Sequence, residues 1–250
     1  MRACVLIPHY SHAEQIGPVL LALEAVALPV IVIDDGSPAA SLAALEAVLG
    51  RFSWATLVRL PVNRGKGGAM MAGLRIARES GYTHAVQIDA DGQHRVADVP
   101  EMLAIAAAEP TALVSGTPVF DATVPGSRRH GRKVSLFWSR VATLSRDIED
   151  AMCGFRVYPL DGVARVLARS RPGAGMEFDA EILVRAHWAG IPLRFLPTPV
   201  VYPPGGRSHF RLLRDNVRIS LMHTRLIIEL IPQLPGLVVR RLRRGRRDAE

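Results

Sequence analysis

Short apolar runs alternate with helical patterns along the first half of the chain. The runs, each of the length of a buried strand, lie at residues 3–7, 29–33, 56–60, 84–88 and 112–115. Helical patterns separate them at about residues 11–26, 37–49, 69–79 and 98–108. Strands that alternate with helices favour right-handed crossovers and a parallel sheet. With 250 residues, 49% of them hydrophobic, the chain suits one large α/β domain, so we expect a Rossmann-like, mostly parallel sheet flanked by helices.

The regular alternation stops after the fifth run. Residues 117–146 are basic and show no clean periodicity before a predicted helix at 134–144. A later helix is expected at 178–189, followed by a strand-like segment at 193–202 that two prolines interrupt. We find no internal repeat and no linker that would mark a second domain.

Polar or glycine-rich loops follow three of the predicted strands. Asp34 and Asp35 end the second run, residues 63–68 follow the third, and residues 89–94 follow the fourth. Ligands of open sheets of this type bind beyond the carboxyl ends of the strands. The three loops are therefore expected to meet on one rim, which is stronger evidence for a site than any one of them.

The loop after the fourth run contains candidate metal ligands. Asp89 and Asp91 are two residues apart, and Gly92 and Gln93 follow them. Mg²⁺ and Mn²⁺ prefer such oxygen ligands and can share their remaining coordination with a diphosphate. Short acidic turns after strands also occur as solvated caps. The neighbouring loops favour the metal hypothesis and hence chemistry on a nucleotide-linked substrate.

The other two loops suit the rest of a nucleotide. Asp34 or Asp35 can accept hydrogen bonds from a base or ribose, or can serve only as a turn residue. Glycines around Lys66 would let backbone N–H groups approach an anion at a helix N-terminus. The spacing is not that of a P-loop, and no Ser or Thr follows the lysine.

Further carboxylates and a basic stretch lie in the second half of the chain. Asp150 precedes a tight turn, where it can contact an acceptor, act as a base, or pair with Arg156. Residues 177–181 open a helix, where acidic side chains interact favourably with the helix dipole. Guanidinium groups between residues 128 and 146 match phosphate oxygens, although a solvated loop is the alternative.

Six short motifs occur in order along the chain. They are Val5-Leu6-Ile7-Pro8, Ile33-Asp34-Asp35-Gly36-Ser37, Asn63-Arg64-Gly65-Lys66-Gly67, Asp89-Ala90-Asp91-Gly92-Gln93-His94, Cys153-Gly154-Phe155-Arg156 and Phe178-Asp179-Ala180-Glu181. Together they resemble family 2 glycosyltransferases of the GT-A fold. The resemblance is greatest to the polyprenyl-phosphate (dolichol-phosphate) mannosyl- or glucosyltransferases, and it extends to about residue 216.

The resemblance implies a role for each part of the rim. A GDP- or UDP-linked sugar donor would contact Pro8, Tyr10, Asp34, Asp35, Asn63, Lys66, Gly67 and Asp89. Mg²⁺ or Mn²⁺ would be held by Asp89, Asp91 and Gln93. The catalytic residues would be Asp150, Asp91 and Glu181. A lipid-linked acceptor, expected to be a polyprenyl phosphate, would bind Arg128, Arg129, Arg132, Lys133, Ser135, Arg207 and Ser208.

Such a site implies an inverting single displacement, in which the divalent ion stabilises charge on the departing nucleoside diphosphate. A lipid phosphate is already an anion and needs no strong base. The chain departs from the family pattern at Gly116-Thr117-Pro118, where relatives usually read Gly-Ser-Arg, and at Arg207-Ser208-His209-Phe210, where Ser-Lys is more usual. A hydroxyl acceptor on a lipid, pigment or glycan therefore stays open, with Asp150 as the preferred base.

Residues 217–250 are treated as a C-terminal segment beyond a catalytic domain of residues 1–216. Residues 217–239 are apolar but too interrupted to span a bilayer. Much of the net charge of +8 comes from Arg240, Arg241, Arg243, Arg244, Arg246 and Arg247. Such a segment suits the inner face of an anionic membrane. A helix packed on the domain with a frayed tail is the equally weighted alternative.

The start of the chain shows no signal-peptide pattern, so we expect a cytoplasmic protein that is peripheral on the membrane. Cys4 and Cys153 have no disulfide or metal-binding spacing and are expected to be reduced thiols. A non-catalytic basic protein that binds membranes or nucleic acid is the alternative of another class. The basic tail lacks interleaved aromatic residues, so no nucleic-acid partner is expected.

Overall fold

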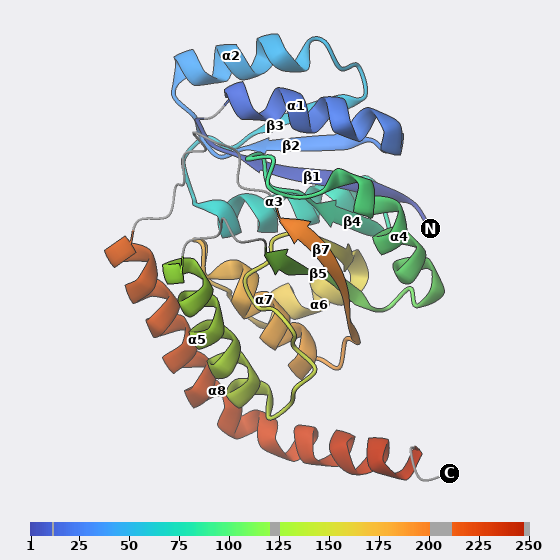
Figure 1. Ribbon diagram of the computed structural model, residues 1–250, viewed down its shortest axis with the longest axis vertical. Coiled ribbons are helices and arrows are strands. Elements are labelled where there is room, and N and C mark those ends of the chain that lie inside the picture. Colours follow the sequence, from blue (N-terminus) through green and yellow to red (C-terminus); the bar gives the residue numbers. More distant parts are fainter. Residues whose placement is uncertain (12, 121–125, 201–211, 248–250) are drawn as a thin grey trace.

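This computed structural model describes residues 1–11, 13–120, 126–200 and 212–247. For residues 126–129, 212 and 239–247 only the backbone is described. The described residues form a seven-stranded sheet with helices on both faces (Figure 1). The expected architecture, a mostly parallel sheet between helical layers, is confirmed.

The sheet is parallel except around one strand. Its members are β1 (Ala3–His9), β2 (Val30–Asp34), β3 (Ala55–Arg59), β4 (His84–Gln87), β5 (Leu113–Phe120), β6 (Arg156–Pro159) and β7 (Leu193–Val200). They lie in the order β3-β2-β1-β4-β6-β5-β7. Strand β6 is antiparallel to both β4 and β5, whereas the other neighbouring pairs are parallel. The carboxyl ends of β1, β2 and β4 therefore meet the start of β6 at one edge.

Helices cover the two faces of the sheet in separate groups. One face carries α1 (Ala13–Leu23), α2 (Ala39–Leu49) and α4 (Val99–Ala108). The opposite face carries α3 (Lys66–Glu79), α6 (Leu160–Arg169) and α7 (Phe178–Trp188). Helices α5 (Gly126–Thr143) and α8 (Leu212–Arg247) pack on each other and on α7 (Figure 1). Two short 3₁₀ helices, η1 (Glu24–Val26) and η2 (Val96–Asp98), precede β2 and α4.

Strand β1 shows why the central strands read as continuous apolar runs. Cys4 and Leu6 belong to the core on the α3 side, and Val5 and Ile7 belong to the core on the α1 side. All four side chains are fully buried. Successive side chains of a strand point to opposite faces, so a strand covered on both faces needs apolar residues at every position.

Helix α6 was not predicted, and three further elements differ from the sequence-based expectation. Strand β5 continues to Phe120 because it pairs with β7 along its whole length, which the local sequence does not indicate. Strand β6 was not predicted, since its buried residues include Arg156 and Tyr158. Helix α5 begins at Gly126 instead of residue 134, within a basic stretch that lacks an apolar period.

Helix α8 packs on the domain through one face. Met222, Leu226 and Leu230 are buried against the core that includes α7. Figure 1 shows α8 bending along its length, and Pro232 and Pro235 lie inside it, where proline removes a backbone hydrogen bond. Among the described helices, none combines the length and the apolar character needed to cross a membrane. Because α8 begins at Leu212, it includes the expected domain boundary at residue 216, and that division stays a prediction.

The first turn of α3 lies against the loop before α7. The N–H groups of Gly67 and Gly68 donate to the carbonyls of Gly175 and Ala174, at 3.2 and 3.0 Å. A Cβ at Gly67 would lie 2.5 Å from the Cβ of Phe178. The glycines therefore permit close packing within the fold, and these two N–H groups are already bonded.

We predict that Gly67→Ala destabilises the protein by about 1–3 kcal/mol, because the new methyl group overpacks the contact between α3 and α7. The measurement is urea unfolding at neutral pH. Gly131→Ala is the matched control, since nothing lies within 4 Å of a Cβ there. That variant should gain up to about 1 kcal/mol from helix propensity. Equal stability of the two variants would contradict the packing argument.

Candidate active site

The two aspartates after β2 are buried and hold neighbouring loops. Asp34 accepts hydrogen bonds from the N–H of Ser37 at 3.1 Å and lies 3.2 Å from Nδ1 of His9. Asp35 accepts from the N–H groups of Arg64 and Gly65, at 2.8 and 2.7 Å. Burial raises the pKa of Asp35, and these backbone donors only partly oppose the rise. Both carboxylates thus fix the shape of the rim, while any contact with a nucleoside stays a prediction.

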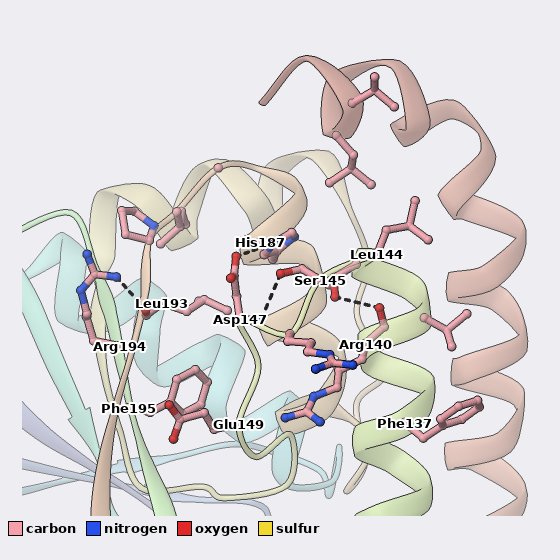
Figure 2. Close-up of a pocket in the computed structure, with 18 residues that line it drawn as sticks. Phe137, Arg140, Leu144, Ser145, Asp147, Glu149, His187, Leu193, Arg194 and Phe195 are labelled. Carbon is pink, nitrogen blue, oxygen red and sulfur yellow. Dashed lines mark hydrogen bonds and ion pairs between the residues drawn. The ribbon is translucent and has the colours of Figure 1, made fainter. Parts of the chain in front are cut away.

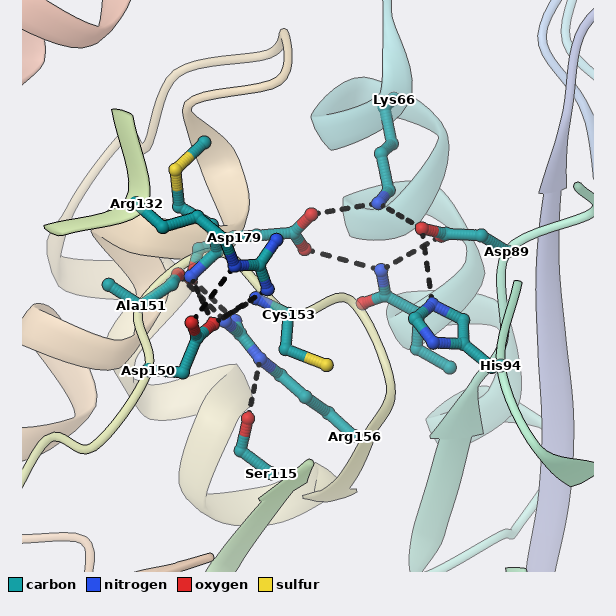
Figure 3. Close-up of polar contacts among 12 residues, drawn as sticks. Lys66, Asp89, His94, Ser115, Arg132, Asp150, Ala151, Cys153, Arg156 and Asp179 are labelled. Carbon is teal, nitrogen blue, oxygen red and sulfur yellow. Dashed lines mark hydrogen bonds and ion pairs between the residues drawn. The ribbon is translucent and has the colours of Figure 1, made fainter. Parts of the chain in front are cut away.

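Lys66 forms the centre of the polar cluster at this edge (Figure 3). Its Nζ lies 2.7 Å from Oδ2 of Asp89 and 2.8 Å from Oδ2 of Asp179. Gln87 donates from Nε2 to Asp179 at 3.2 Å and accepts from the hydroxyl of Tyr158 at 2.8 Å. The side chains of the cluster come from α3, β4, β6 and α7 and from the loop after β4. The cluster therefore joins parts of the chain that are far apart in sequence.

The electrostatics keep this cluster charged at neutral pH. Burial opposes the charge on Lys66, but Asp179 and Asp89 outweigh it and hold the pKa of the ammonium above its usual range. Burial likewise opposes the charge on Asp89. Lys66 and His94 overcome that effect, so the pKa of Asp89 lies far below its usual range.

Asp91 lies beside this charged cluster, and its pKa shifts in the direction opposite to that of Asp89. Burial and the negative charge of Asp89 raise its pKa, while His94 and the N–H of Gln93 oppose the rise. Its Oδ1 accepts that N–H at 3.1 Å. A cation between the two carboxylates would relieve the repulsion that raises this pKa.

The donor set fits a divalent cation only in part. His94 lies 3.5 Å from Asp89 and stacks on Phe155, and its Nδ1 is buried without a hydrogen-bond partner among the described residues. No group of three or more His, Cys, Asp or Glu side chains in the described ranges is arranged to hold a metal. Asp89 and Asp91 provide hard oxygen ligands, and the remaining ligands would have to come from a substrate.

On the other side of the cluster, Asp150 is fully engaged. Arg132 donates from Nε and a terminal nitrogen to its two oxygens, at 3.1 and 3.0 Å (Figure 3). The N–H groups of Met152 and Cys153 also donate to Asp150, at 2.9 and 2.7 Å. The ion pair of Asp150 is with Arg132 and not with the predicted Arg156, while a contact with an acceptor stays a prediction.

Of the other predicted acceptor residues, Lys133 and Ser135 have described side chains. Lys133 is exposed, and Ser135 is buried between α5 and α8, where its hydroxyl lies 3.0 Å from Nε2 of His223. Glu181, predicted to be catalytic, is fully buried and pairs with Arg185 and Arg225. The backbone positions of Arg128 and Arg129 lie in α5, but their side chains are outside the described part. Arg207 and Ser208 also lie outside the described residues.

Sequence reasoning missed several members of the cluster. Asp179 was attributed to favourable interaction with the helix dipole, although it binds Lys66 directly. Gln87 and Tyr158 sit inside strands and carried no motif of their own. Arg156 is fully buried and donates to the carbonyls of Asp179 and Ala151, so it connects the start of α7 to the loop before β6. The signal available was the Phe178-Asp179-Ala180-Glu181 motif.

Replacing Lys66 by methionine should cost about 3 kcal/mol at neutral pH, because it leaves two carboxylates without their counter-charge. Wild-type Asp89 has a lowered pKa, so its stabilising contribution is present at neutral pH and is lost as the pH falls. In the variant the unpaired carboxylates have raised pKa values, so their cost disappears on acidification. The difference in unfolding free energy should therefore shrink toward about pH 4. The control is Lys133→Met, at an exposed lysine, which should stay within about 0.5 kcal/mol of wild type. A loss of unfolding free energy in Lys66→Met that grows as the pH falls would contradict the account.

Comparisons with known proteins agree with this architecture. The family model described as "Glycosyl transferase family 2" matches residues 4–163. An undecaprenyl-phosphate mannosyltransferase from Micrococcus luteus is 27% identical over 214 residues, which are 81% of this chain and 84% of that protein. A polyprenol monophosphomannose synthase from Mycolicibacterium smegmatis is 27% identical, with 74% and 72% covered. Among solved structures, glucosyl-3-phosphoglycerate synthase from Mycobacterium tuberculosis in complex with Mn²⁺ and uridine-diphosphate-glucose superposes with a TM-score of 0.64 at 16% identity, covering 92% of this chain and 78% of that one. The chain belongs to glycosyl transferase family 2 and is a glycosyltransferase with the GT-A fold.

Proposed function

We propose that this enzyme moves a hexose from a nucleotide-sugar to a lipid-linked phosphate, a polyprenyl phosphate, with inversion at the anomeric carbon. The observation that carries the donor half is the pair Asp89 and Asp91 beside Lys66 at the carboxyl edge of the sheet. The names of the relatives, which are polyprenyl-phosphate or dolichyl-phosphate sugar transferases, support the acceptor class.

Asp89 and Asp91, with Gln93, are the residues that would hold Mg²⁺ or Mn²⁺. A divalent ion supplies neutralisation of the charge that develops on the departing nucleoside diphosphate. Lys66 adds a positive charge beside the same carboxylates, and it is positioned to contact a donor phosphate once Asp89 turns to other ligands. The structural neighbour with Mn²⁺ and uridine-diphosphate-glucose supports this arrangement, while either GDP or UDP fits the proposal.

Arg132 is the described basic residue best placed for the acceptor phosphate. It forms a two-point contact with the carboxylate of Asp150, and a guanidinium group binds a phosphate with the same planar geometry. An arriving phosphate would replace Asp150 as the partner of Arg132. The phosphate oxygen then attacks the anomeric carbon from the face opposite the departing diphosphate, without a strong base.

The enzyme is proposed to work at the inner face of the cell membrane, as a peripheral cytoplasmic protein, because its acceptor is anchored there. The second candidate is transfer to a hydroxyl of a lipid, pigment or glycan. It is favoured by Gly116-Thr117-Pro118, which lacks the Arg that relatives usually carry there. In that case Asp150 removes the hydroxyl proton.

Asp91→Ala should lower sugar transfer at least about 100-fold, because the charge on the departing diphosphate loses part of its stabilisation. The same variant should lose the thermal stabilisation that GDP or UDP gives in the presence of Mn²⁺. Asp161→Ala removes an exposed carboxylate that pairs with Arg78, and it serves as the matched control. Unchanged transfer by Asp91→Ala would remove the basis of the proposal.

Asp150→Asn separates the two acceptor classes. With a phosphate acceptor, kcat should stay within about tenfold of wild type, since no proton has to be removed. With a hydroxyl acceptor, kcat should fall by about 10²- to 10⁴-fold because the general base is lost. Transfer to each acceptor is measured with the full-length enzyme, and Glu149→Gln, at the exposed neighbouring acid, controls for the change in charge. A base-type loss with a phosphate acceptor would contradict the mechanism proposed above.

A further inference from the structure

Helix α8 has an apolar stripe that faces away from the domain. Its inward stripe consists of Met222, Leu226, Leu230 and Leu237, all buried. Its outward stripe consists of Leu213, Val217, Leu221, Ile228, Ile231 and Val238, all exposed. Both sets recur at intervals of three, four or seven residues, which puts each set on one side of a helix. A surface helix that packs on a domain normally has a polar outer face, so packing on α5 and α7 does not explain the outward stripe.

The neighbouring helix α5 continues this apolar surface. Phe137 and Trp138 are 59% and 41% exposed, and their rings contact each other edge to face at 5.3 Å between centroids. Phe137 also lines a cavity of about 1260 Å³ together with Leu237 and Val238 of α8. In Figure 2, Phe137 projects from α5 toward α8. Phe137 of α5 therefore lies near the exposed Val238 of α8.

The charge of the same region identifies the partner. Helix α8 runs on through a segment that contains six arginines, and the whole chain carries a net charge of +8. Helices with an apolar face and a cationic end lie in the interface of anionic bilayers. Basic residues near such a surface strengthen binding, and tryptophan prefers the level of the head groups.

We propose that the outward stripe of α8 and the aromatic pair Phe137 and Trp138 of α5 form a surface that docks on a bilayer containing anionic phospholipid. The proposal rests on the proposed function, because a lipid-linked acceptor requires contact with a membrane. Beyond that function, it specifies which side of the enzyme faces the membrane. Arg132 and Phe137 both lie on α5, so docking through Phe137 would bring the helix that carries the Arg132–Asp150 pair to the membrane surface, where a lipid-linked phosphate is presented.

The test is binding of the full-length protein to vesicles of phosphatidylcholine and phosphatidylglycerol, measured by co-sedimentation. Ile228→Asp combined with Ile231→Asp should weaken binding more than about tenfold, because it removes two apolar contacts and adds two negative charges. Leu21→Asp is the matched control: Leu21 is 63% exposed, as Ile228 and Ile231 are 64% and 68% exposed, but it lies on α1 across the sheet. This variant should bind like wild type. Unchanged thermal unfolding of all variants shows that each is folded.

Trp138 gives a second measurement. Its fluorescence should shift to shorter wavelength with the anionic vesicles, and Trp138→Phe should remove that shift. Wild-type affinity in the double variant overturns the proposal. It is also overturned if wild type without vesicles is a dimer that the double variant abolishes, because the stripe is then an interface between copies.

The docking surface and the proposed function fail separately. If vesicle binding depends on the outward stripe but the enzyme transfers no sugar to a lipid phosphate, the docking surface is supported and the proposed function is contradicted. If the enzyme transfers sugar in detergent but its vesicle binding does not depend on the outward stripe, the proposed function is supported and the docking surface is contradicted.

Discussion

A partly buried ammonium group between two carboxylates holds the candidate site together. Lys66 begins α3, Asp89 follows β4, and Asp179 lies in the first turn of α7, so one positive charge joins three elements that are distant in sequence. The turn before β6 comes close enough that a Cβ at Gly154 would lie 2.8 Å from both Nζ of Lys66 and Oδ2 of Asp89. Removing one partner would leave an unpaired charge, which is why the cluster depends on all of its members.

The same cluster connects the donor and acceptor halves of the proposed reaction. Asp89 lies close to Asp91 on the donor side. On the acceptor side, Arg156 donates hydrogen bonds to the backbone carbonyls of Asp179 and of Ala151, which is next to Asp150. Arg132 reaches Asp150 from α5, whose outer face bears the exposed aromatic pair. Membrane contact, acceptor binding and donor binding would thus be linked through consecutive contacts of the described residues.

The donor half of the fold was predictable from sequence because its physical causes are local. Strands β1, β2 and β4 are covered on both faces, so they read as apolar runs, and their polar loops share one edge by topology. The loop after β4 could be located from the end of an apolar run, the spacing of Asp89 and Asp91, and the neighbouring polar loops.

The rest depends on contacts between distant segments. Strand β6 has a buried Arg156 whose partners are far away in the chain, so no apolar pattern marks it. The close approach of Phe178 to Gly67 is a packing role that the local sequence does not show, while the predicted anion-binding role stays a prediction. Asp179 could not be assigned to Lys66 without the packing of α7 on α3. The outward stripe of α8 was visible only once the inward stripe was known to be covered.

The most direct test of the central claim is the anomalous diffraction of Mn²⁺ in crystals soaked with manganese and GDP or UDP. The account predicts a manganese peak that bridges Asp89 and Asp91 to the pyrophosphate, with Lys66 turned from Asp89 toward a phosphate oxygen. A nucleotide bound without manganese while Lys66 still joins Asp89 to Asp179, or one bound away from this edge of the sheet, would contradict it.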